Sequence, residues 1–476
     1  MDLKKTKKVL FYLAIAYWLL ALMIYVIASP QFHVRSVASE TASPVRDIGE
    51  FIDGVTVTQQ VRIPAQKLDA VAVMAADYGQ QNHGRIVLEV MAPDGTCLAA
   101  GEADISLAGN WKYLAIPLDA PLMGQKGQVL TLVFSAKGCA SGSTITLLHG
   151  GQKAQSDAVG VCTVGKKELS DVLCLHLTGT DKINDHAIYL GVVTLLFIAC
   201  VPVCIKWLSD TKKGKNNPVM MISAMSIRYR FLLSQLVNRE FKVKYKRSAL
   251  GIGWSFFNPL LTMLIQYTVF STLFKTDLEH YPVYLLTGIV IFNFFSEALN
   301  LGMTAITGNA SLISKVYVPK YIYVFSKVIS SSVNLLLSLI PLFSVVLVSG
   351  LKLKPSFLLL IFDFICLITF VIGMALLLST SMVFFRDTQF LWGIVSMIWM
   401  YCTPIFYPIT IIPENLLPFF KLNPLYQFIT FARTSIISGI SPELSAYFAC
   451  AAPAVLALLL GSVVFKKHQQ SFTLYL

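Results

Sequence analysis

The chain is divided between long apolar runs and one stretch of short, mixed segments. Apolar runs without charge cover about Val9–Pro30 and Ala187–Ile205, and six further runs that are mostly apolar follow. Runs of about 20 apolar residues are long enough to cross a membrane as helices. The later six are Gly253–Phe274, Val283–Met303, Tyr321–Val348, Phe357–Phe384, Phe390–Phe406 and Ala446–Phe465. The pattern predicts a polytopic α-helical membrane protein with about eight spans.

Residues 31-186 have the pattern of an all-β domain. Short alternating segments such as VTVTQQVRI and QVLTLVFSA are separated by Gly, Asp, Asn and Pro. Alternation with a period of two predicts strands that bury one face, and about eight strands are typical of a β-sandwich. We therefore expect an inserted all-β sandwich domain between an anchor helix at residues 1-30 and a second anchor helix at residues 187-207.

The charge distribution predicts the orientation in the membrane. Residues 31–186 contain 12 Lys/Arg and 16 Asp/Glu, whereas the rest of the chain carries 26 basic and 10 acidic residues that mostly flank the apolar runs. Basic residues that flank membrane spans are typically on the cytoplasmic side. We expect both termini and the linker at residues 208-225 to be cytoplasmic, and residues 31-186 to be extracytoplasmic. The basic exceptions are assigned to short outer connections: Lys275, Lys352, Lys354, Lys421 and Arg433.

Two alternatives follow from composition. The net charge of +12 is compatible with nucleic-acid binding, but its placement beside apolar runs accounts for it, so we expect no nucleic acid as a partner. The first apolar run could also be a cleaved signal peptide, since VIASP supplies small residues. Its length favours a retained anchor.

A surface helix is predicted at residues 226-248. An apolar stripe contains Tyr229, Leu232, Leu233, Leu236, Val237, Phe241 and Tyr245, whereas Arg230, Arg239, Lys242 and Lys246 lie largely off it. This amphipathic pattern fits a helix on the inner membrane surface, with its apolar face in the lipid boundary and its basic residues toward phosphates. Trp254, just beyond SALGIG, opens the next span.

Four stretches in this order carry a family resemblance. They are LVNREFKVKYKRSALGIGWSFFNPLLTMLIQYTVFSTLF, LLTGIVIFNFFSEALNLGMTAITGNASLISKVYVPKYIYVFSKV, FFRDTQFLWGIVSMIWMYCTPIFYPITIIPENLLPFFKLNPLYQFITFAR and the terminal FKKHQQSF. The chain from residue 226 to its end resembles ABC-2 type permeases that export O-antigen, capsule or teichoic-acid polymers. The N-terminal anchor–sandwich–anchor unit departs from the plain six-span family.

The resemblance implies partners and an energy source. Such permeases work as a homodimer with two copies of an ABC ATPase subunit, which hydrolyses Mg-ATP. We expect this chain to be no enzyme and to hold no cofactor, with a six-span core at residues 249-476. The ATPases would bind the amphipathic helix and a coupling segment at 308-320. The expected coupling residues are Arg239, Glu240, Lys242, Tyr245, Lys246, Ser311, Lys315, Pro319 and Lys320. Glu240 pairs locally with Lys244 or docks on the ATPase.

The substrate path is expected to be lined by aromatic rings, on which a sugar polymer slides. Proline at five positions between 404 and 424 excludes a straight helix, and the resemblance implies an outer re-entrant gate at residues 404-435. Glu297 and Asp363 lie within apolar spans; each either serves transport or holds helices together, with Asn293, Asn300 and Asn334 as candidate partners. The expected path residues are Trp254, Phe257, Tyr267, Glu297, Tyr401, Phe406 and Tyr407.

The sandwich offers further candidates. Tyr78, Trp111 and Tyr113 could stack on glycan, although packing in the core is the favoured interpretation for each. Cys97, Cys139, Cys162 and Cys174 form either two disulfides or four packed thiols. GVCTVGKK matches a phosphate-binding loop but lacks the Ser or Thr that follows its lysine, so we interpret it as a hairpin turn. No metal-site spacing is present.

The sequence therefore predicts the permease subunit of an ATP-driven exporter in the bacterial cytoplasmic membrane. Its substrate would be a lipid-linked polysaccharide, and membrane lipid surrounds it. The alternatives are an ABC-2 exporter of small hydrophobic compounds and a membrane receptor that uses the sandwich as a ligand sensor. A receptor would need a cytoplasmic signalling module, and a membrane glycosyltransferase would need catalytic acidic sequence; neither is found.

Overall fold

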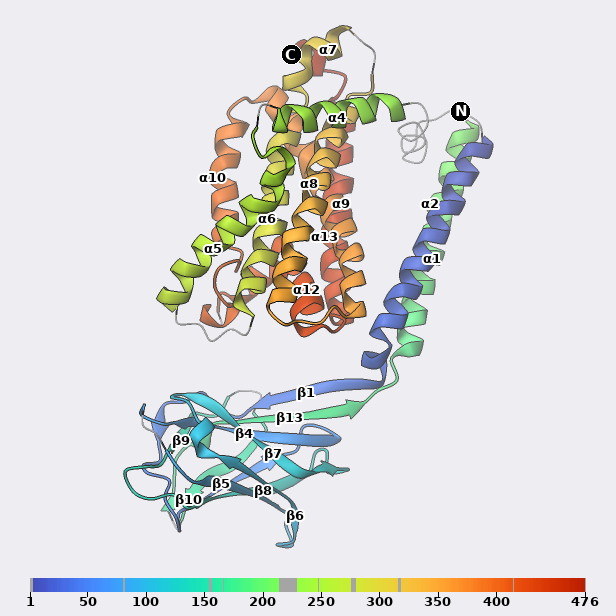
Figure 1. The fold of residues 1–476 in the computed structure, drawn as a ribbon. Coiled ribbons are helices and arrows are strands. Elements are labelled where there is room, and N and C mark those ends of the chain that lie inside the picture. The colour runs from blue at the N-terminus through green and yellow to red at the C-terminus, as the bar shows by residue number, and fades with distance from the viewer. Residues whose placement is uncertain are drawn as a thin grey trace. The chain divides into compact units, whose positions relative to one another are not determined.

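The structure is a computed structural model that describes residues 3–79, 82–153, 156–165, 167–213, 229–246, 248–274, 280–315, 318–413 and 415–475. It divides into two compact units. The first combines Met1–Ala28 with Gly191–Leu476 and is helical, and the second, Ser29–Leu190, is built of strands (Figure 1). The predicted fold class, a helical membrane protein with an inserted all-β domain, is confirmed.

Two antiparallel sheets form the second unit. One sheet has the order β1-β13-β4-β9-β12, with β2 on β9 and β7 on β4, and the other has the order β11-β10-β3-β8-β5-β6. The described residues thus contain thirteen strands rather than about eight, because several are very short. The strands are β1 Val34–Glu40, β2 Arg46–Asp47, β3 Thr56–Arg62, β4 Lys67–Ala76, β5 Arg85–Met91, β6 Cys97–Asp104, β7 Lys112–Met123, β8 Val129–Lys137, β9 Thr146–Gly150, β10 Ala158–Val164, β11 Lys167–Glu168, β12 Val172–Leu173 and β13 Leu175–Lys182.

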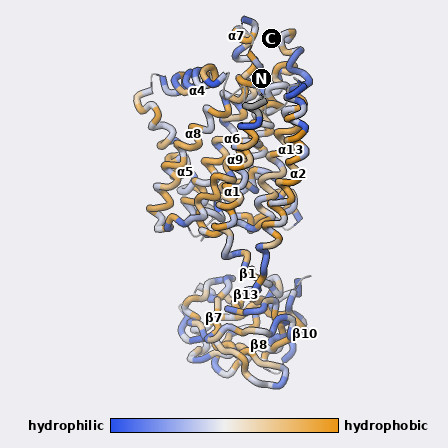
Figure 2. Tube along the Cα trace, turned by 90° about the vertical axis from the view of Figure 1, so that its right-hand side faces the viewer, coloured by the Kyte–Doolittle hydropathy of each residue, from blue (hydrophilic) through white to orange (hydrophobic). Residues whose placement is uncertain are grey.

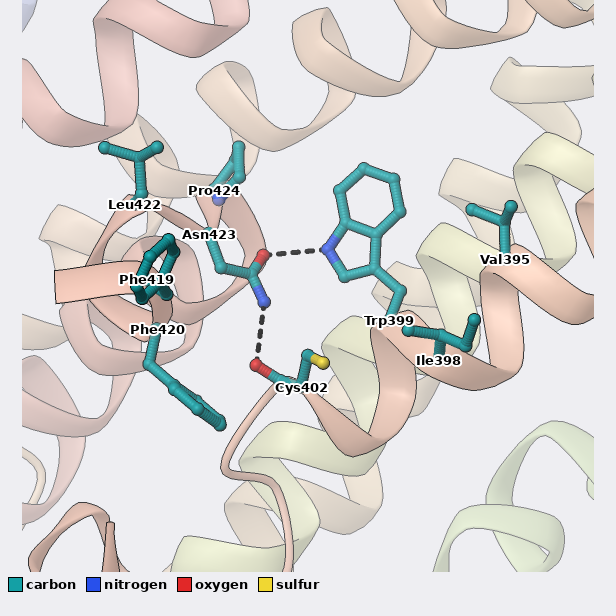
Figure 3. A pocket seen from close by; sticks show the side chains of 9 residues that line it. All are labelled: Val395, Ile398, Trp399, Cys402, Phe419, Phe420, Leu422, Asn423 and Pro424. Carbon is teal, nitrogen blue, oxygen red and sulfur yellow. Dashed lines mark hydrogen bonds between the residues drawn. The ribbon is translucent and has the colours of Figure 1, made fainter. Parts of the chain in front are cut away.

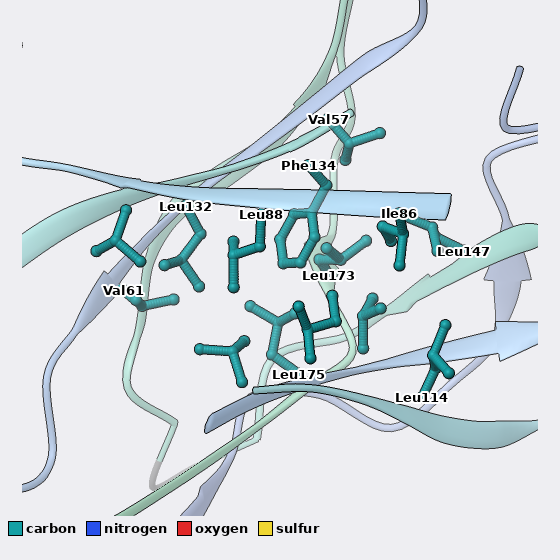
Figure 4. Packing of buried hydrophobic residues seen from close by; sticks show 14 of the residues in the cluster. Val57, Val61, Ile86, Leu88, Leu114, Leu132, Phe134, Leu147, Leu173 and Leu175 are labelled. Atoms are coloured by element: carbon teal, nitrogen blue, oxygen red, sulfur yellow. The ribbon is translucent and has the colours of Figure 1, made fainter. Parts of the chain in front are cut away.

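The core of this unit lies between the two sheets. Leu88 and Phe134 from one sheet face Leu114 and Leu175 from the other (Figure 4), and all four are buried. The strands bury one face because their residues point alternately to the two sides of the sheet. In β3, exposed and buried positions alternate in this way. Each fully buried side chain of this size contributes about 1.5–3 kcal/mol to the stability of the fold.

The segment GVCTVGKK, which was interpreted as a hairpin turn rather than a phosphate-binding loop, belongs to the hairpin of β10 and β11. Val164 of β10 pairs with Lys167 of β11 in this hairpin.

The four cysteines of the all-β unit are free thiols. Cys97 is exposed, whereas Cys139, Cys162 and Cys174 are buried. Burial raises the pKa of the Cys162 and Cys174 thiols to about 12. Of the two alternatives that the sequence left open, the structure has free thiols, of which three are packed and Cys97 is exposed.

This arrangement predicts selective labelling. At pH 8 a maleimide should modify Cys97 in the folded chain and leave Cys162 and Cys174 unmodified, because a thiol with a pKa near 12 is about one part in 10,000 thiolate at that pH. Peptide mapping by mass spectrometry before and after denaturation locates the label. A disulfide-linked peptide pair among the four cysteines would contradict the structure.

Helices α1 (Leu3–His33) and α2 (His186–Lys212) pack against each other. The Tyr17 hydroxyl donates to the Val193 carbonyl at 2.7 Å, and the Trp18 ring lies 5.4 Å from that of Phe197. Only 11% of the most apolar stretch of each helix is buried in the protein. Figure 2 shows that apolar residues cover both helices. They are therefore suited to a lipid environment on most sides.

The remaining helices form a bundle of antiparallel long segments joined by short elements (Figure 1). The helices that run along the bundle are α5 Trp254–Phe274, α6 Tyr281–Met303, α8 Tyr321–Val348, α9 Leu360–Phe384, α10 Thr388–Tyr401 and α13 Leu444–His468. The others are α4 Arg230–Tyr245, α7 Ala310–Lys315, α11 Leu417–Leu422, α12 Pro424–Arg433 and α14 Phe472–Tyr475, with single turns η2 Gly251–Gly253, η3 Thr307–Asn309, η4 Pro355–Leu359, η5 Ile409–Ile411 and η6 Thr434–Ser438. The all-β unit adds η1 Ile105–Leu107.

Six helices in the described residues are long and apolar enough to cross a membrane: α1, α2, α6, α8, α9 extended by η4, and α13. Helix α5, whose apolar sequence is interrupted by Asn258 and Gln266, is not among them. One of the eight predicted spans, Phe390–Phe406, is not a single helix in the structure. Helix α10 has 14 residues and ends at Tyr401. It is about 21 Å long, less than a hydrocarbon core of about 30 Å.

Close helix packing holds the middle of the bundle. Helix α6 is central, with 72% of its apolar stretch buried. Helices α9 and α13 approach so closely at Gly373 that an added Cβ would lie 2.2 Å from the Ala457 carbonyl carbon. Only glycine leaves room for this contact, and small residues permit close helix packing in membranes.

Candidate functional site

Helix α4 lies across the ends of α6 and α8, and we call this the α4 end of the bundle (Figure 1). Its predicted stripe is the covered face: Leu236 is buried, and Leu233, Val237 and Phe241 are half-buried. Helix α4 packs on α8, a contact that the sequence analysis did not predict. Periodicity identifies an apolar face, but not what covers it. The predicted positions 226–228 and 247 lie outside the described residues.

Glu240 fastens α4 to the bundle. Its carboxylate accepts hydrogen bonds from Arg239 at 3.0 Å and from Lys327 of α8 at 2.6 Å. Arg239 also donates to the Asn309 side chain of η3 at 2.9 Å. The predicted local pair with Lys244 is not formed, because Lys327 comes close enough to compete. Burial by itself raises the pKa of Glu240, but the bonds and charges of Lys327 and Arg239 outweigh it and hold the pKa below its ordinary value.

A second cluster joins α4 to three bundle helices. Glu297 of α6 accepts from Lys244 at 2.8 Å, and from Asn334 and Ser331 of α8 at 2.7 and 3.3 Å. The Tyr245 hydroxyl donates to the Asn334 side chain at 3.1 Å and shares a hydrogen bond with Ser255 of α5. Tyr245 therefore touches the start of α5 and the middle of α8 together. Glu297, expected on the substrate path, is partly exposed and bonded to α4.

The other predicted coupling residues separate into two groups. One group is exposed on α4, just after it or on α7, and no ion pair or hydrogen bond from these side chains is found within the described residues: Lys242, Lys246, Ser311 and Lys315. Lys320 is different. Its ammonium donates to the Gln469 carbonyl at 2.6 Å and lies 5.5 Å from the Phe472 ring, and burial lowers its pKa. Pro319 beside it is half-buried. Lys320 therefore holds the C-terminal segment, whereas the first group is accessible to a partner.

A second site lies at the opposite end, which we call the α12 end. After α10 ends at Tyr401, the chain to Pro413 is irregular apart from η5. Arg433, at the end of α12, is buried. Its guanidinium donates to the carbonyls of Pro404 at 2.8 Å, Ile405 at 3.0 Å and Tyr284 at 3.1 and 3.2 Å. No carboxylate pairs with it among the described residues.

Helix α6 completes the attachment of this segment. The hydroxyls of Tyr281 and Tyr284 donate to the carbonyls of Phe406 and Tyr407 at 2.6 and 2.9 Å. The Arg433 guanidinium lies 3.3 Å from the centre of the Tyr284 ring. A Cβ at position 288 would come within 3.0 Å of the guanidinium, so Gly288 provides its space. Arg433 was expected in a short outer connection; the structure places it at the end of α12, where it binds the carbonyls of Pro404 and Ile405 in an irregular segment that Pro404 keeps from continuing as a helix.

A groove of about 400 Å³ lies beside this segment, between α10 and α11 (Figure 3). Trp399 of α10 points toward Asn423, and its indole donates to the amide oxygen at 2.8 Å. The Asn423 amide donates to the Cys402 carbonyl at 3.1 Å and to Thr403, and its oxygen caps α12. Asn423 therefore fixes α12 to the end of α10.

The predicted path aromatics fall at both ends of α5. At the α12 end, Phe406 is buried and stacks on Phe270 at 5.3 Å, Tyr267 lies 5.9 Å from Tyr281, and Tyr407 donates to the Tyr401 carbonyl at 2.5 Å. Trp254 and Phe257 lie at the other end of α5, and both are exposed. Asp363 is fully buried, with the Cys450 thiol 3.9 Å from one oxygen, and its other oxygen has no hydrogen-bond partner in the described chain.

The aromatic candidates of the all-β unit also separate. Tyr78 and Trp111 are 58% and 52% exposed, so the favoured expectation that they pack in the core is wrong. Tyr113 is half-buried on the sheet, with its ring 5.5 Å from that of His176. The first two are therefore available to a ligand.

The sequence comparisons identify the family. A family model described as ABC-2 type transporter matches residues 232–437. The O-antigen export system permease protein RfbA of Myxococcus xanthus is 30% identical over 250 residues, which cover 51% of this chain and 95% of that protein. This chain is an ABC-2 type transporter protein. An RfbA of Klebsiella pneumoniae is 29% identical over 44% of this chain and 81% of its own length. The polysialic acid transport protein KpsM of Escherichia coli is 21% identical over 49% and 92%.

The match places both structural sites inside the ABC-2 region, since Glu240, Glu297 and Arg433 all lie between residues 232 and 437. Sequence reasoning did not find Lys327, Asn309, Asn423 or the role of Arg433. Two signals were present. A lysine inside an apolar run, as at 327, requires a partner, and an Asn before a Pro, as at 423, is typical of a helix N-cap.

Proposed function

We propose that this chain is the permease subunit of an ATP-driven exporter that moves a lipid-linked polysaccharide across the bacterial cytoplasmic membrane. The observation that carries the proposal is the similarity to a permease named for O-antigen export along 95% of that protein's length. A second relative, named for polysialic acid transport, supports a polymer rather than a small hydrophobic compound as the substrate. The ABC-2 family match agrees with both.

The α4 end would face the cytoplasm and receive the force of the ATPase. This orientation is supported by the exposed lysines of α4 and α7 and by Lys466 and Lys467 at the end of α13, because basic residues stay in the cytoplasm. The all-β unit would then be extracytoplasmic and both termini cytoplasmic. Energy comes from Mg-ATP in two partner ATPase subunits, and this chain contributes no hydrolytic group of its own.

The two α4 clusters would transmit the motion. When an ATPase moves α4, the Glu240–Lys327 pair pulls on α8, while the Lys244–Glu297 pair acts on α6 and Tyr245 acts on α5. Short charge-assisted bonds between partly buried groups resist separation more than exposed pairs do. The bundle helices would therefore move with α4 rather than independently of it.

The path itself would form between two copies of the chain. Helices α5 and α10 present large apolar side chains that this chain leaves exposed, among them Leu261 and Ile265 of α5 and Phe390 and Ile394 of α10. The exposed aromatic rings of Trp254, Phe257 and Tyr401 lie on the same two helices. In a homodimer these helices would meet, and the rings would offer stacking faces for sugar units. The Arg433-bound segment would act as the gate at the outer mouth.

Charge reversal tests the docking surface. In a chain carrying Lys242→Glu, Lys246→Glu and Lys315→Glu together, co-purification with the proposed ATPase subunit should fall at least tenfold, because three accessible attractive charges become repulsive. Surface polysaccharide should fall in parallel. Lys352→Glu, an exposed lysine in the connection between α8 and η4, serves as the matched control and should leave the complex intact. Normal complex formation by the triple variant would refute this docking surface.

A further inference from the structure

The all-β unit holds two exposed aromatic rings at one end of a strand pair. Strands β4 and β7 are antiparallel, with Ala75 opposite Lys112. Tyr78 follows the end of β4 and Trp111 immediately precedes β7, so both rings emerge at the same end of this pair. Strand β4 begins beside the end of β13 that leads to α2, since Lys67 pairs with Thr180. The two rings therefore lie at the end of β4 remote from that connection.

Both aromatic residues have a backbone that side chains rarely adopt. Tyr78 has φ +55° and Trp111 has φ +58°, and they are the non-glycine residues with positive φ among the described residues of the all-β unit. Glycine or asparagine adopts this conformation at lower cost. A large ring that is half exposed gains little from packing, so packing does not explain why these positions carry Tyr and Trp. Strain retained at a surface position is typical of a functional site.

Polar and apolar groups beside the rings complete a surface. The Tyr78 hydroxyl donates to the Asp47 carboxylate at 3.2 Å, which fixes the ring and leaves an acceptor next to it. The loop before Trp111 begins with η1, where the Ile105 amide donates to the Gly84 carbonyl at 3.1 Å and so joins this loop to the segment after Tyr78. Leu107 in η1, four residues before Trp111 in the same loop, is 76% exposed.

We propose that Tyr78 and Trp111 form a glycan-binding site for the exported polymer. A pyranose ring offers an apolar C–H face that stacks on an aromatic ring and hydroxyls that donate to a carboxylate, and the surface presents both features. This inference rests on the proposed function, which supplies a polysaccharide as the ligand. Two rings fixed on separate loops would bind successive sugar units and keep an emerging polymer from sliding back.

Binding should be measured on the full-length chain in nanodiscs, with delipidated surface polysaccharide purified from the organism that encodes it as the probe. The wild-type chain should bind saturably, and Tyr78→Ala and Trp111→Ala should each weaken affinity at least tenfold. Trp111→Phe keeps a stacking face and should retain most of the affinity. Met123→Ala, an exposed apolar residue at the opposite end of β7, is the matched control and should bind as the wild type does.

A second variant separates binding from folding. Trp111→Asn suits the positive φ, so its melting temperature should not fall, while its affinity should fall as in Trp111→Ala. Unchanged affinity in all Tyr78 and Trp111 variants, absence of binding by the wild type, or capture of a protein by the same residues would overturn the inference. Deletion of the gene for this chain tests the proposed function separately. If deletion abolishes surface polysaccharide, the exporter assignment stands even when the glycan-binding site is overturned. If deletion leaves surface polysaccharide unaltered, the exporter assignment itself is rejected.

Discussion

Replacing Glu240 with lysine should reduce polysaccharide export at least tenfold while the chain still inserts in the membrane. The substitution places a third positive charge beside Arg239 and Lys327, where the wild-type carboxylate accepts bonds from both. Removing one partner of a partly buried pair leaves the other charge unsatisfied, at a cost of about 3–5 kcal/mol for a fully buried pair. Helix α4 should then lose its attachment to α8. Surface polysaccharide, quantified against chain abundance, gives the result.

The charge swap is the control for this prediction. Glu240→Lys combined with Lys327→Glu restores opposite charges at the same two positions and should recover a substantial part of export. Gln235→Lys, an exposed position on the other face of α4, adds the same charge and should have little effect. Equal loss in the single and swapped variants would show that the pair does not act as a unit.

The same pair predicts a pH dependence. Because the folded protein holds the pKa of Glu240 below its ordinary value of 4.5, the carboxylate stabilises α4 docking fully above that pH. This contribution is lost as the pH falls through the lower pKa of the folded state. Hydrogen exchange of the α4 amides should therefore accelerate only below pH 4.5 after correction for intrinsic rates. Glutamine does not titrate in this range, so the Glu240→Gln chain should lack the part of the acceleration of hydrogen exchange that protonation of Glu240 causes.

Replacing Arg433 with methionine should destabilise the bundle and abolish export. Four hydrogen bonds to the carbonyls of Tyr284, Pro404 and Ile405 disappear. The Pro404 carbonyl still accepts from the Tyr284 hydroxyl, and the Tyr284 carbonyl belongs to α6, so the largest loss is at the Ile405 carbonyl. An unsatisfied buried carbonyl costs about 1–3 kcal/mol. The melting temperature of the purified chain should fall clearly, and surface polysaccharide should fall at least tenfold.

Two comparisons make the Arg433 prediction specific. Arg433→Lys retains the charge but not the planar fork that reaches several carbonyls, so it should recover only part of the stability. Lys421→Met removes an exposed cation from α11 in the same region and should be close to wild type. A stable, active Arg433→Met chain would mean that the irregular segment does not depend on these bonds.

The sequence predicted the fold class because apolar length and strand alternation are local properties. The same local reasoning identified which face of α4 is apolar, and the prolines after Tyr401 excluded a straight helix. It could not supply partners across the bundle. Glu240 has Lys244 four residues away, yet Lys327, 87 residues distant in sequence, takes its place. Only the packing of α4 on α8 brings those charges together.

Arg433 is a second residue whose partners could not be predicted from the sequence. From the sequence it was assigned to a short outer connection, with no partner predicted for it. The carbonyls that it satisfies belong to segments about 30 and 150 residues away, and no periodicity connects them to it. Conversely, packing in the core was the favoured expectation for Tyr78 and Trp111, and their exposed rings contradict it. Neither this exposure nor the positive φ of both residues can be read from the sequence pattern.

The central claim is that a separate ATPase acts on the bundle through α4 and α7. Photo-crosslinking in membranes measures this contact most directly, with a photoreactive amino acid placed singly at Lys242, Lys315 or Lys352. The account predicts adducts with the ATPase subunit at positions 242 and 315 and none at 352. Adducts at 352 alone, or no ATPase adduct at 242 and 315 in cells that export polymer, would contradict it.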